Sequence, residues 1–371
     1  MKLQTTLRKK IESVMEDGEK KPLFSMESFL YATSLIYGSA VKFRRTLYRK
    51  GILRPKRLPC KVISIGNITV GGTGKTPMTI YVADVVKRLG YQVVVISRGY
   101  KGGSEKPGGI VSNGRKFFMG AEAAGDEPFM MAKKLENIPV VVGKNRFKAG
   151  ELSIREFNPD VVVLDDAFQH LKLFRDINIV LLDYRYPFGN HHLIPRGILR
   201  EPISSVNDGD AYILTRADAP DSDSIASPIL ERMKRPFFRS FHVPSAYSTN
   251  REMSEIHDPE YLKGRRGYAF SGIARNSDFR RTIDMLGCDI VGFSEFPDHY
   301  RYAGNDLEQI SERAKKAGAE VLITTEKDYV RIHQMRTWPV ELVVIGIRTS
   351  FGDQSDAFHD FIHKRLTDFP G

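Results

Sequence analysis

Residues 61–76 read KVISIGNITVGGTGKT, and this stretch decides the fold. A β-branched apolar run at 62–65 leads into a glycine-rich turn, which ends in Gly74-Lys75-Thr76 and opens into a helical pattern. A strand, a glycine-rich loop and a helix in this order are typical of a phosphate-binding loop, because backbone N–H groups and the helix N-terminus can face one anion. The lysine reaches terminal phosphates and the threonine hydroxyl can hold Mg²⁺.

The loop departs from the pattern G-x-x-x-x-G-K-[ST] at its first position, which is Thr69 instead of glycine. We therefore expect Gly71 and Gly72 to supply the positive φ angles of the entry turn. The alternative is a glycine-rich turn between a strand and a helix with no ligand. The residues predicted to bind the phosphates are Thr69, Val70, Gly71, Gly72, Thr73, Gly74, Lys75 and Thr76.

Composition indicates a globular protein with an anionic partner. The 371 residues are enough for two domains, and 41% hydrophobic with 27% charged residues argues against disorder. An excess of 56 Lys and Arg over 45 Asp and Glu, a net charge of +11, suggests a nucleic acid, a membrane surface or a phosphorylated substrate. Two cysteines without C-x-x-C spacing argue against a disulfide framework or zinc site and fit a reducing cytosol.

An apolar stretch at 29–41 is followed by nine Lys and Arg, and no acid, between 42 and 61. Thirteen uncharged residues are too few to cross a bilayer comfortably, so this pattern favours a helix attached to an anionic cytoplasmic leaflet. The alternative is a helix docked on the core with a solvated basic face. A nucleic-acid arm is less favoured, because no basic and aromatic platform recurs elsewhere. We expect no cleavable signal peptide.

From residue 60 onward short apolar strands alternate with helices. A helical pattern at 77–89 stops at Gly90 and is followed at once by a strand at 92–96, as in a parallel βαβ unit. Further strands are predicted at 138–142, 161–164, 178–182, 211–215, 236–243, 268–271, 321–324 and 342–347, and helices at 129–135, 278–286, 306–317 and 356–366. A polar, proline-bearing segment at 216–228 predicts a domain boundary. The predicted division is a basic N-terminal segment 1–57, a nucleotide-binding domain 58–225 and a smaller α/β domain 226–371.

Two pairs of acids could serve phosphate chemistry. Asp165 and Asp166 end an apolar strand, which is the place for an acid that binds Mg²⁺ or its waters beside a phosphate loop. His170 follows closely, and is either near the phosphates or an ordinary loop histidine. Asp126 and Glu127 precede a helix, where by themselves they favour an N-terminal cap.

A set of motifs in one order indicates a family. They are VGGTGKT at 70–76, SRGY at 97–100, GDEP at 125–128, LDDAFQH at 164–170, LIPRGILREP at 193–202, SGIA at 271–274, FPDHY at 296–300 and TTEKD at 324–328. From about residue 25 to residue 350 the chain resembles tetraacyldisaccharide 4'-kinase, the inner-membrane enzyme of lipid A synthesis. The resemblance implies an α/β fold of two P-loop-type (RecA-like) lobes with mostly parallel sheets. It also implies a two-stranded linker, for which 236–243 and 342–347 are the candidates, and an N-terminal helix lying on the membrane.

The resemblance also assigns roles to individual residues. The family's catalytic aspartate falls on Asp126, with Glu127 near the metal and His299 as the histidine partner. Ala167 stands where a glycine is usual, and Arg275-Asn276 stand where a proline is common. The expected catalytic residues are Asp126, His299, Lys75, Asp166 and His170, and the expected metal ligands are Thr76, Glu127 and Asp165.

The implied reaction is transfer of the γ-phosphoryl group of ATP, with Mg²⁺, to the 4'-hydroxyl of a tetraacylated glucosamine disaccharide 1-phosphate. The expected partners are this lipid and an anionic membrane surface, with no nucleic acid and no obligate protein partner, on the cytoplasmic face of a bacterial inner membrane. One alternative is a membrane-associated P-loop ATPase or GTPase switch, although Val70 stands where partition-type ATPases carry a lysine. Another is a non-enzymatic membrane tether, which leaves the acid clusters unexplained.

Overall fold

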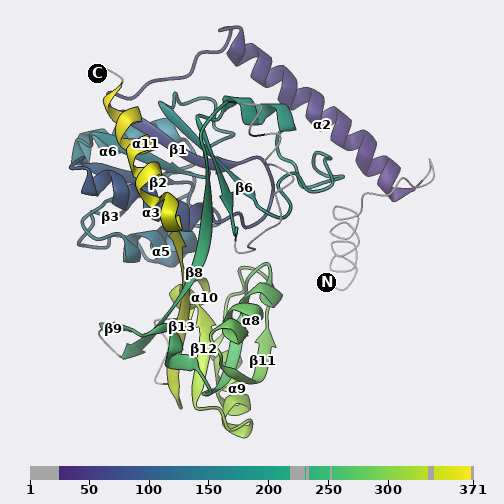
Figure 1. Ribbon diagram of the computed structural model, residues 1–371, viewed down its shortest axis with the longest axis vertical. Coiled ribbons are helices and arrows are strands. Elements are labelled where there is room, and N and C mark those ends of the chain that lie inside the picture. The colour runs from purple at the N-terminus through teal and green to yellow at the C-terminus, as the bar shows by residue number, and fades with distance from the viewer. Residues whose placement is uncertain (1–24, 218–229, 231–233, 251–252, 333–337, 369–371) are drawn as a thin grey trace.

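The structure, a computed structural model, describes residues 25–217, 230, 234–250, 253–332 and 338–368. Within these ranges the strands form one continuous sheet of thirteen, which passes through two lobes (Figure 1). The path across the sheet is β11-β10-β12-β13-β8-β7-β6-β1-β5-β2-β4-β3, with β9 beside β8. The strands are β1 Lys61–Asn67, β2 Val93–Ser97, β3 Gly109–Ser112, β4 Val140–Val142, β5 Val161–Asp165, β6 Ile177–Asp183, β7 Ala211–Thr215, β8 Phe237–Asn250, β9 Met253–Ile256, β10 Arg266–Ser271, β11 Asp289–Glu295, β12 Val321–Thr325 and β13 Glu341–Ser350.

Helices cover the sheet in both lobes (Figure 1). The α-helices described are α2 Met26–Arg49, α3 Lys75–Arg88, α4 Ala121–Ala124, α5 Asp126–Lys134, α6 Arg146–Phe157, α8 Asn276–Met285, α9 Gly304–Lys316, α10 Glu326–Ile332 and α11 Ser355–Thr367. Short 3₁₀ turns lie at η1 Ile203–Asp208, η2 Pro259–Leu262 and η3 Gly352–Gln354. The predicted mostly parallel α/β fold is confirmed.

Strand β1 lies at the centre of the first lobe. It pairs in parallel with β5 on one side and β6 on the other, and its residues are almost all buried. The phosphate loop therefore leaves the sheet at the same edge as the acids that end β5, because the carboxyl ends of parallel strands meet there. Helix α3 follows the loop and buries Met78, Val82 and Val86 against the sheet.

Two long strands join the lobes. Strand β8 begins parallel to β7 in the first lobe and continues into the second, where it pairs antiparallel with β13 from Phe241↔Ser350 to Ser248↔Val343. The two segments expected as linker strands are therefore hydrogen-bonded to each other. Strands β10, β11, β12 and β13 are parallel and carry the second lobe, whose cores include Phe270, Leu322 and Val344.

The last helix returns to the first lobe. Phe358, Ile362 and Leu366 of α11 belong to the same core as Ile63 and Val82. By sequence position α11 falls in the predicted domain 226–371, but it packs beside α3 (Figure 1). The spatial units are therefore not two consecutive pieces of chain. The predicted boundary at 216–228 lies almost entirely outside the described residues.

Helix α2 extends along one side of the first lobe (Figure 1). Its buried positions recur at helical spacing and are Leu30, Ser34, Gly38, Val41 and Arg45. The helix is fixed by the Tyr37 hydroxyl, which donates to the Arg200 carbonyl, and by Arg45, which donates to Glu201. Among the described residues, no helix has both the length and the apolarity needed to cross a membrane.

Candidate active site

Two sets of hydrogen bonds hold the phosphate loop in shape. The Asn67 amide, buried at the end of β1, donates to Thr73 Oγ1 at 2.9 Å and to Thr69 Oγ1 at 3.2 Å. The Val70 N–H donates to the Ile198 carbonyl at 2.7 Å, so part of the motif at 193–202 lies against the loop. These bonds fix the loop before a nucleotide arrives, which lowers the entropy cost of ordering it around phosphates.

Two glycines give the loop its turns. Gly71 has φ +108° and Gly74 has φ +76°, whereas Gly72 does not have a positive φ, so the expectation for Gly72 is wrong. A Cβ atom on Gly74 would lie 2.7 Å from His242 Nε2. Lys75 opens α3 directly after this left-handed glycine, and Thr76 follows it and is buried. Lysine, threonine and helix N-terminus therefore have the order that phosphate binding needs.

Asp165 lies at the end of β5 and is fully buried. Its carboxylate accepts hydrogen bonds from Ser97 Oγ at 2.9 Å and Thr79 Oγ1 at 3.2 Å. Burial and the nearby charges of Glu127 and Asp166 raise the pKa of Asp165 to about 6. The raised pKa indicates that negative charge is crowded at this edge of the sheet.

Asp166 has the opposite environment. Its φ of +46° places a non-glycine residue in the left-handed region, a strained conformation that is concentrated at functional sites. Arg200 Nη1 lies 3.0 Å from its Oδ2, and Lys75 Nζ lies 3.8 Å from its Oδ1. Burial alone would raise the pKa of Asp166, but the charges of Lys75 and Arg200 outweigh it and lower the pKa.

Glu127 links this cluster to the second lobe, because Lys327 Nζ lies 2.9 Å from its Oε1. Burial would raise the pKa of Glu127, but the charge and hydrogen bond of Lys327 outweigh it and the pKa is lowered. The described residues contain no group of three or more His, Cys, Asp and Glu side chains arranged to hold a metal by themselves. The donors nevertheless fit Mg²⁺, which keeps several waters and takes phosphate oxygens, and whose charge would offset the crowding at Asp165.

Asp126 meets His299 across the two lobes. The His299 Nδ1 atom lies 2.9 Å from Asp126 Oδ2, and Arg331 donates to the same oxygen. The capping alternative for Asp126 is wrong, because Gly125 occupies the N-cap position of α5 and Asp126 is its first helical residue. Burial would raise the pKa of Asp126, but the hydrogen bonds from His299 and Arg331 lower it to about 2. The carboxylate is therefore ionised at neutral pH.

His170 is not joined to this cluster. Its Nε2 atom is buried without a hydrogen-bond partner, and no described hydrogen bond or ion pair connects its ring to Lys75 or to the acids. Burial, with nearby arginines, lowers the pKa of His170 to about 4, so the ring is neutral at pH 7. A catalytic role for His170 stays a prediction.

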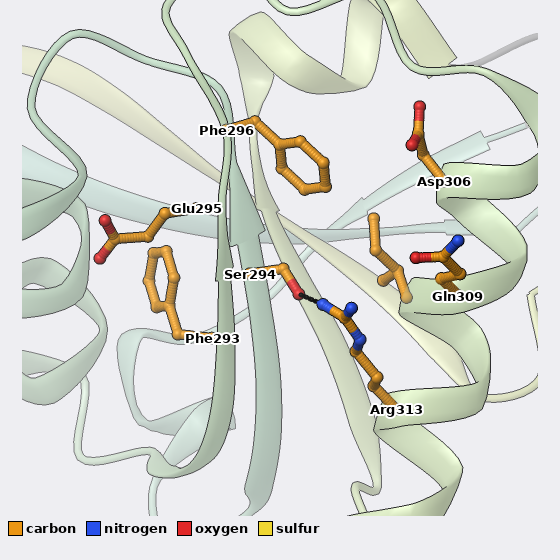
Figure 2. Close-up of a pocket in the computed structure, with 8 residues that line it drawn as sticks. Phe293, Ser294, Glu295, Phe296, Asp306, Gln309 and Arg313 are labelled. Carbon is orange, nitrogen blue, oxygen red and sulfur yellow. Dashed lines mark hydrogen bonds between the residues drawn. The ribbon is translucent and has the colours of Figure 1, made fainter. Parts of the chain in front are cut away.

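Several residues of the site had no assigned role in the sequence. Lys327 and Arg331 belong to α10, which begins within the TTEKD motif, and both contact the acids that begin α5. The available signal was the run of polar residues at the end of a buried parallel strand. A separate pocket in the second lobe lies between β11 and α9, where Arg313 Nη1 is 3.5 Å from Ser294 Oγ (Figure 2). None of the predicted site residues lines it.

A phosphate loop, adjoining acids on β5 and a carboxylate–histidine pair from two lobes define the class of P-loop phosphotransferases. The model of the family described as "Tetraacyldisaccharide-1-P 4'-kinase" matches residues 26–367. The chain therefore belongs to that family. A relative from Desulfatibacillum aliphaticivorans named "Tetraacyldisaccharide 4'-kinase" is 39% identical over 369 residues, covering 98% of this chain and 99% of the relative. One of the same name from Syntrophus aciditrophicus is also 39% identical and covers 95% and 97%.

A solved structure of the same family is also similar to this chain. It is the "apo" form of LpxK from Aquifex aeolicus in complex with ATP, with a TM-score of 0.77, 33% identity, and coverage of 92% of this chain and 100% of that chain. The expected family, the mostly parallel α/β fold and the kinase activity are confirmed, and the solved relative binds ATP, which is the expected nucleotide. The alternative of an ATPase or GTPase switch is not favoured.

Proposed function

We propose that this chain transfers the γ-phosphoryl group of ATP to the 4'-hydroxyl of a tetraacylated glucosamine disaccharide 1-phosphate, with Asp126 accepting the hydroxyl proton. The observation that carries the proposal is the 2.9 Å contact between Asp126 and His299, which are 173 positions apart in sequence. An interlobe pair beside a phosphate loop is suited to an acceptor that enters between the lobes. The contact already brings the carboxylate and the histidine together, so the acceptor hydroxyl would meet a preorganised pair.

The chemistry needs positioning more than a strong base. The acceptor oxygen bonds to the γ-phosphorus while the bond to the bridging oxygen breaks, and ADP leaves with the electron pair. Because the transition state is loose, the hydroxyl proton leaves late, and a carboxylate of low pKa is sufficient if it is ionised and correctly placed. Lys75 and the loop N–H groups hold the phosphates. Asp166, which is paired with Arg200, orients the phosphate-binding groups at this end of the sheet.

Residues at the same end of the sheet would hold the metal ion. Thr76, Asp165 and Glu127 would hold Mg²⁺ directly or through its waters, and the ion would neutralise charge on the phosphates. Asp165 is already oriented by Ser97 and Thr79. Glu127 is paired with Lys327, so that lysine must exchange or share its partner when a cation binds.

We also propose that α2 attaches the enzyme to the cytoplasmic face of an inner membrane, where the acyl chains of the substrate are buried. The helix exposes large apolar side chains on the side away from the lobe, including Phe29, Ile36 and Phe43. The basic cluster at 42–61 begins within α2 and continues beyond its end at Arg49. Apolar side chains beside a run of cations are suited to the interface of an anionic bilayer.

The test of the reaction is ADP release from MgATP in detergent micelles, with and without an acylated disaccharide 1-phosphate. We expect release to depend on the lipid, and phosphate to appear on the sugar. Asp126→Asn is expected to lower kcat by about 10²- to 10⁴-fold with little change in ATP binding. Asp289→Asn, at an exposed position on β11, is the matched control. Hydrolysis that ignores the lipid would reject the reaction, and equal loss of ATP binding and turnover in Asp126→Asn would reject the base.

A further inference from the structure

Three hydrogen-bond donors converge on a single oxygen of Asp126. Arg331 Nε lies 2.9 Å and Arg331 Nη2 lies 2.7 Å from Asp126 Oδ2, and His299 Nδ1 lies 2.9 Å from the same atom. The Arg331 side chain is only 7% exposed. None of the described residues donates a hydrogen bond to Asp126 Oδ1. The two oxygens of one carboxylate therefore have different environments.

The guanidinium of Arg331 is itself fixed by the second lobe. Its Nη1 donates to Asp328 Oδ1 and to the Gly272 carbonyl, each at 3.1 Å. Asp328 is fully buried and accepts further hydrogen bonds from the Tyr302 hydroxyl at 2.9 Å and from Thr325 Oγ1 at 2.6 Å. The planar fork of an arginine loses little freedom when it is held in this way. Arg331 therefore meets Asp126 with a preset direction.

We propose that Arg331 is a positioning residue for phosphoryl transfer, which holds Asp126 Oδ2 against the second lobe and leaves Oδ1 to receive the proton of the acceptor hydroxyl. The inference rests on the proposed role of Asp126 and adds to it. A carboxylate that can rotate presents Oδ1 to the acceptor in only a fraction of encounters, whereas a fork of two N–H groups fixes its plane. Arg331 touches neither substrate nor the reacting phosphorus in this role.

The same two helices carry an ion pair that provides a control. Lys134 Nζ on α5 lies 2.6 Å from Glu326 Oε1 on α10, so this pair also joins the lobes but does not contact Asp126. If Arg331 only fastened α10 to α5, removing either cation would have a similar effect on turnover. If Arg331 positions Asp126, only its removal lowers kcat.

The experiment measures kcat and the KM for ATP with MgATP and the acylated disaccharide 1-phosphate in micelles. Arg331→Ala is expected to lower kcat by about 10²-fold while the KM for ATP stays within about twofold, since misplacing a reacting group costs turnover more than binding. Guanidinium ions at non-denaturing concentration are expected to restore part of the kcat of Arg331→Ala. They should not restore Asp126→Asn or raise the activity of Lys134→Gln.

Arg331→Lys keeps the charge without the fork and is expected to recover less than half of the lost kcat. It also serves as the test variant if Arg331→Ala does not fold, which thermal unfolding and ATP binding would reveal. The inference is wrong if Arg331 variants lose no more kcat than Lys134→Gln, or if guanidinium rescues nothing while Arg331→Lys is fully active. Retained activity in Asp126→Asn would instead reject the proposed base, so the two failures are distinct.

Discussion

Arg45 and Glu201 form an ion pair that is almost completely removed from solvent, with 2.9 Å between Arg45 Nη1 and Glu201 Oε2. The pair joins α2 to the segment that follows the cis bond between Ile194 and Pro195. The neighbour of Glu201 in sequence is Arg200, whose guanidinium lies on Asp166. The proposed membrane helix α2 therefore contacts Glu201. The preceding residue, Arg200, contacts Asp166 at the end of the sheet where the nucleotide is expected to bind.

Arg45→Met is expected to lower the free energy of unfolding by about 2–3 kcal/mol, because the buried Glu201 carboxylate loses its buried arginine and keeps only the half-exposed Arg44 as an ion-pair partner. Arg49→Met, which removes a largely exposed contact to Asp208, is the control and should cost at most about 1 kcal/mol. Denaturant unfolding of both variants measures the difference. Equal costs would mean that the buried pair contributes no more than the exposed one.

Phe358→Ala is expected to cost about 3–5 kcal/mol of stability. Phe358 is fully buried on α11 and stacks on Phe351, with ring centroids 4.2 Å apart. Removing the ring leaves a cavity in the core that α11 shares with α3. The unfolding midpoint measures the loss, and Phe361→Ala, at a partly buried position on the same helix, should cost clearly less. A smaller loss for Phe358→Ala than for Phe361→Ala would contradict the packing described.

Ile36→Ser and Phe43→Ser are each expected to weaken binding to vesicles that contain phosphatidylglycerol by about tenfold or more, given about 1.5–3 kcal/mol for burying such a side chain. The two side chains are 73% and 67% exposed on α2. Vesicle sedimentation at two salt concentrations measures both contributions to membrane binding, because salt weakens the electrostatic contribution and leaves the apolar one. Met285→Ser, at a position equally exposed on α8, should bind as the wild type does. Unchanged binding in both α2 variants would remove this helix as the membrane contact.

His242→Gln is expected to reduce the loss of stability in mild acid. Burial, with the nearby charge of Arg216, lowers the pKa of His242 from 6.5 to about 4. Between these pH values the unfolded chain binds a proton at this residue and the folded chain does not, so stability present above pH 6.5 falls as the pH falls. The free energy of unfolding then falls by up to about 1.4 kcal/mol per pH unit because of this residue. Urea midpoints at pH 6 and pH 5 measure it, with His363→Gln, at an exposed position, as the control. An unchanged slope in His242→Gln would contradict a partly buried, neutral ring.

The parallel core of the first lobe was predictable because each strand is an apolar run buried on both faces. Residues 211–215 are strand β7 as predicted, and β5 differs from its prediction only by including Asp165. Helix α6 was not predicted, since its buried positions are Arg146, Ala149, Gly150 and Ser153, which do not form an apolar stripe. Strand β11 was missed for a related reason: it lies at the sheet edge and most of its side chains are only partly buried.

The site was predictable where its residues follow one another in the chain, and less so where the fold brings them together. The phosphate loop and the paired acids have local patterns. The contact of His299 with Asp126 was expected only through the family resemblance, and Arg331 had no pattern that linked it to a residue 205 positions away. Such a contact depends on the crossing of β8 and β13 between the lobes, which no short stretch of sequence encodes.

The return of α11 to the first lobe has a consequence for synthesis of the protein. Chains emerge from the ribosome N-terminus first, and domains generally fold in that order. Here the core around β1 and α3 includes Phe358 and Ile362 of α11, which follow every strand of the second lobe in the chain. The nucleotide lobe therefore completes its packing only after the whole second lobe has emerged, so a chain halted before α11 leaves part of the apolar core of the first lobe uncovered.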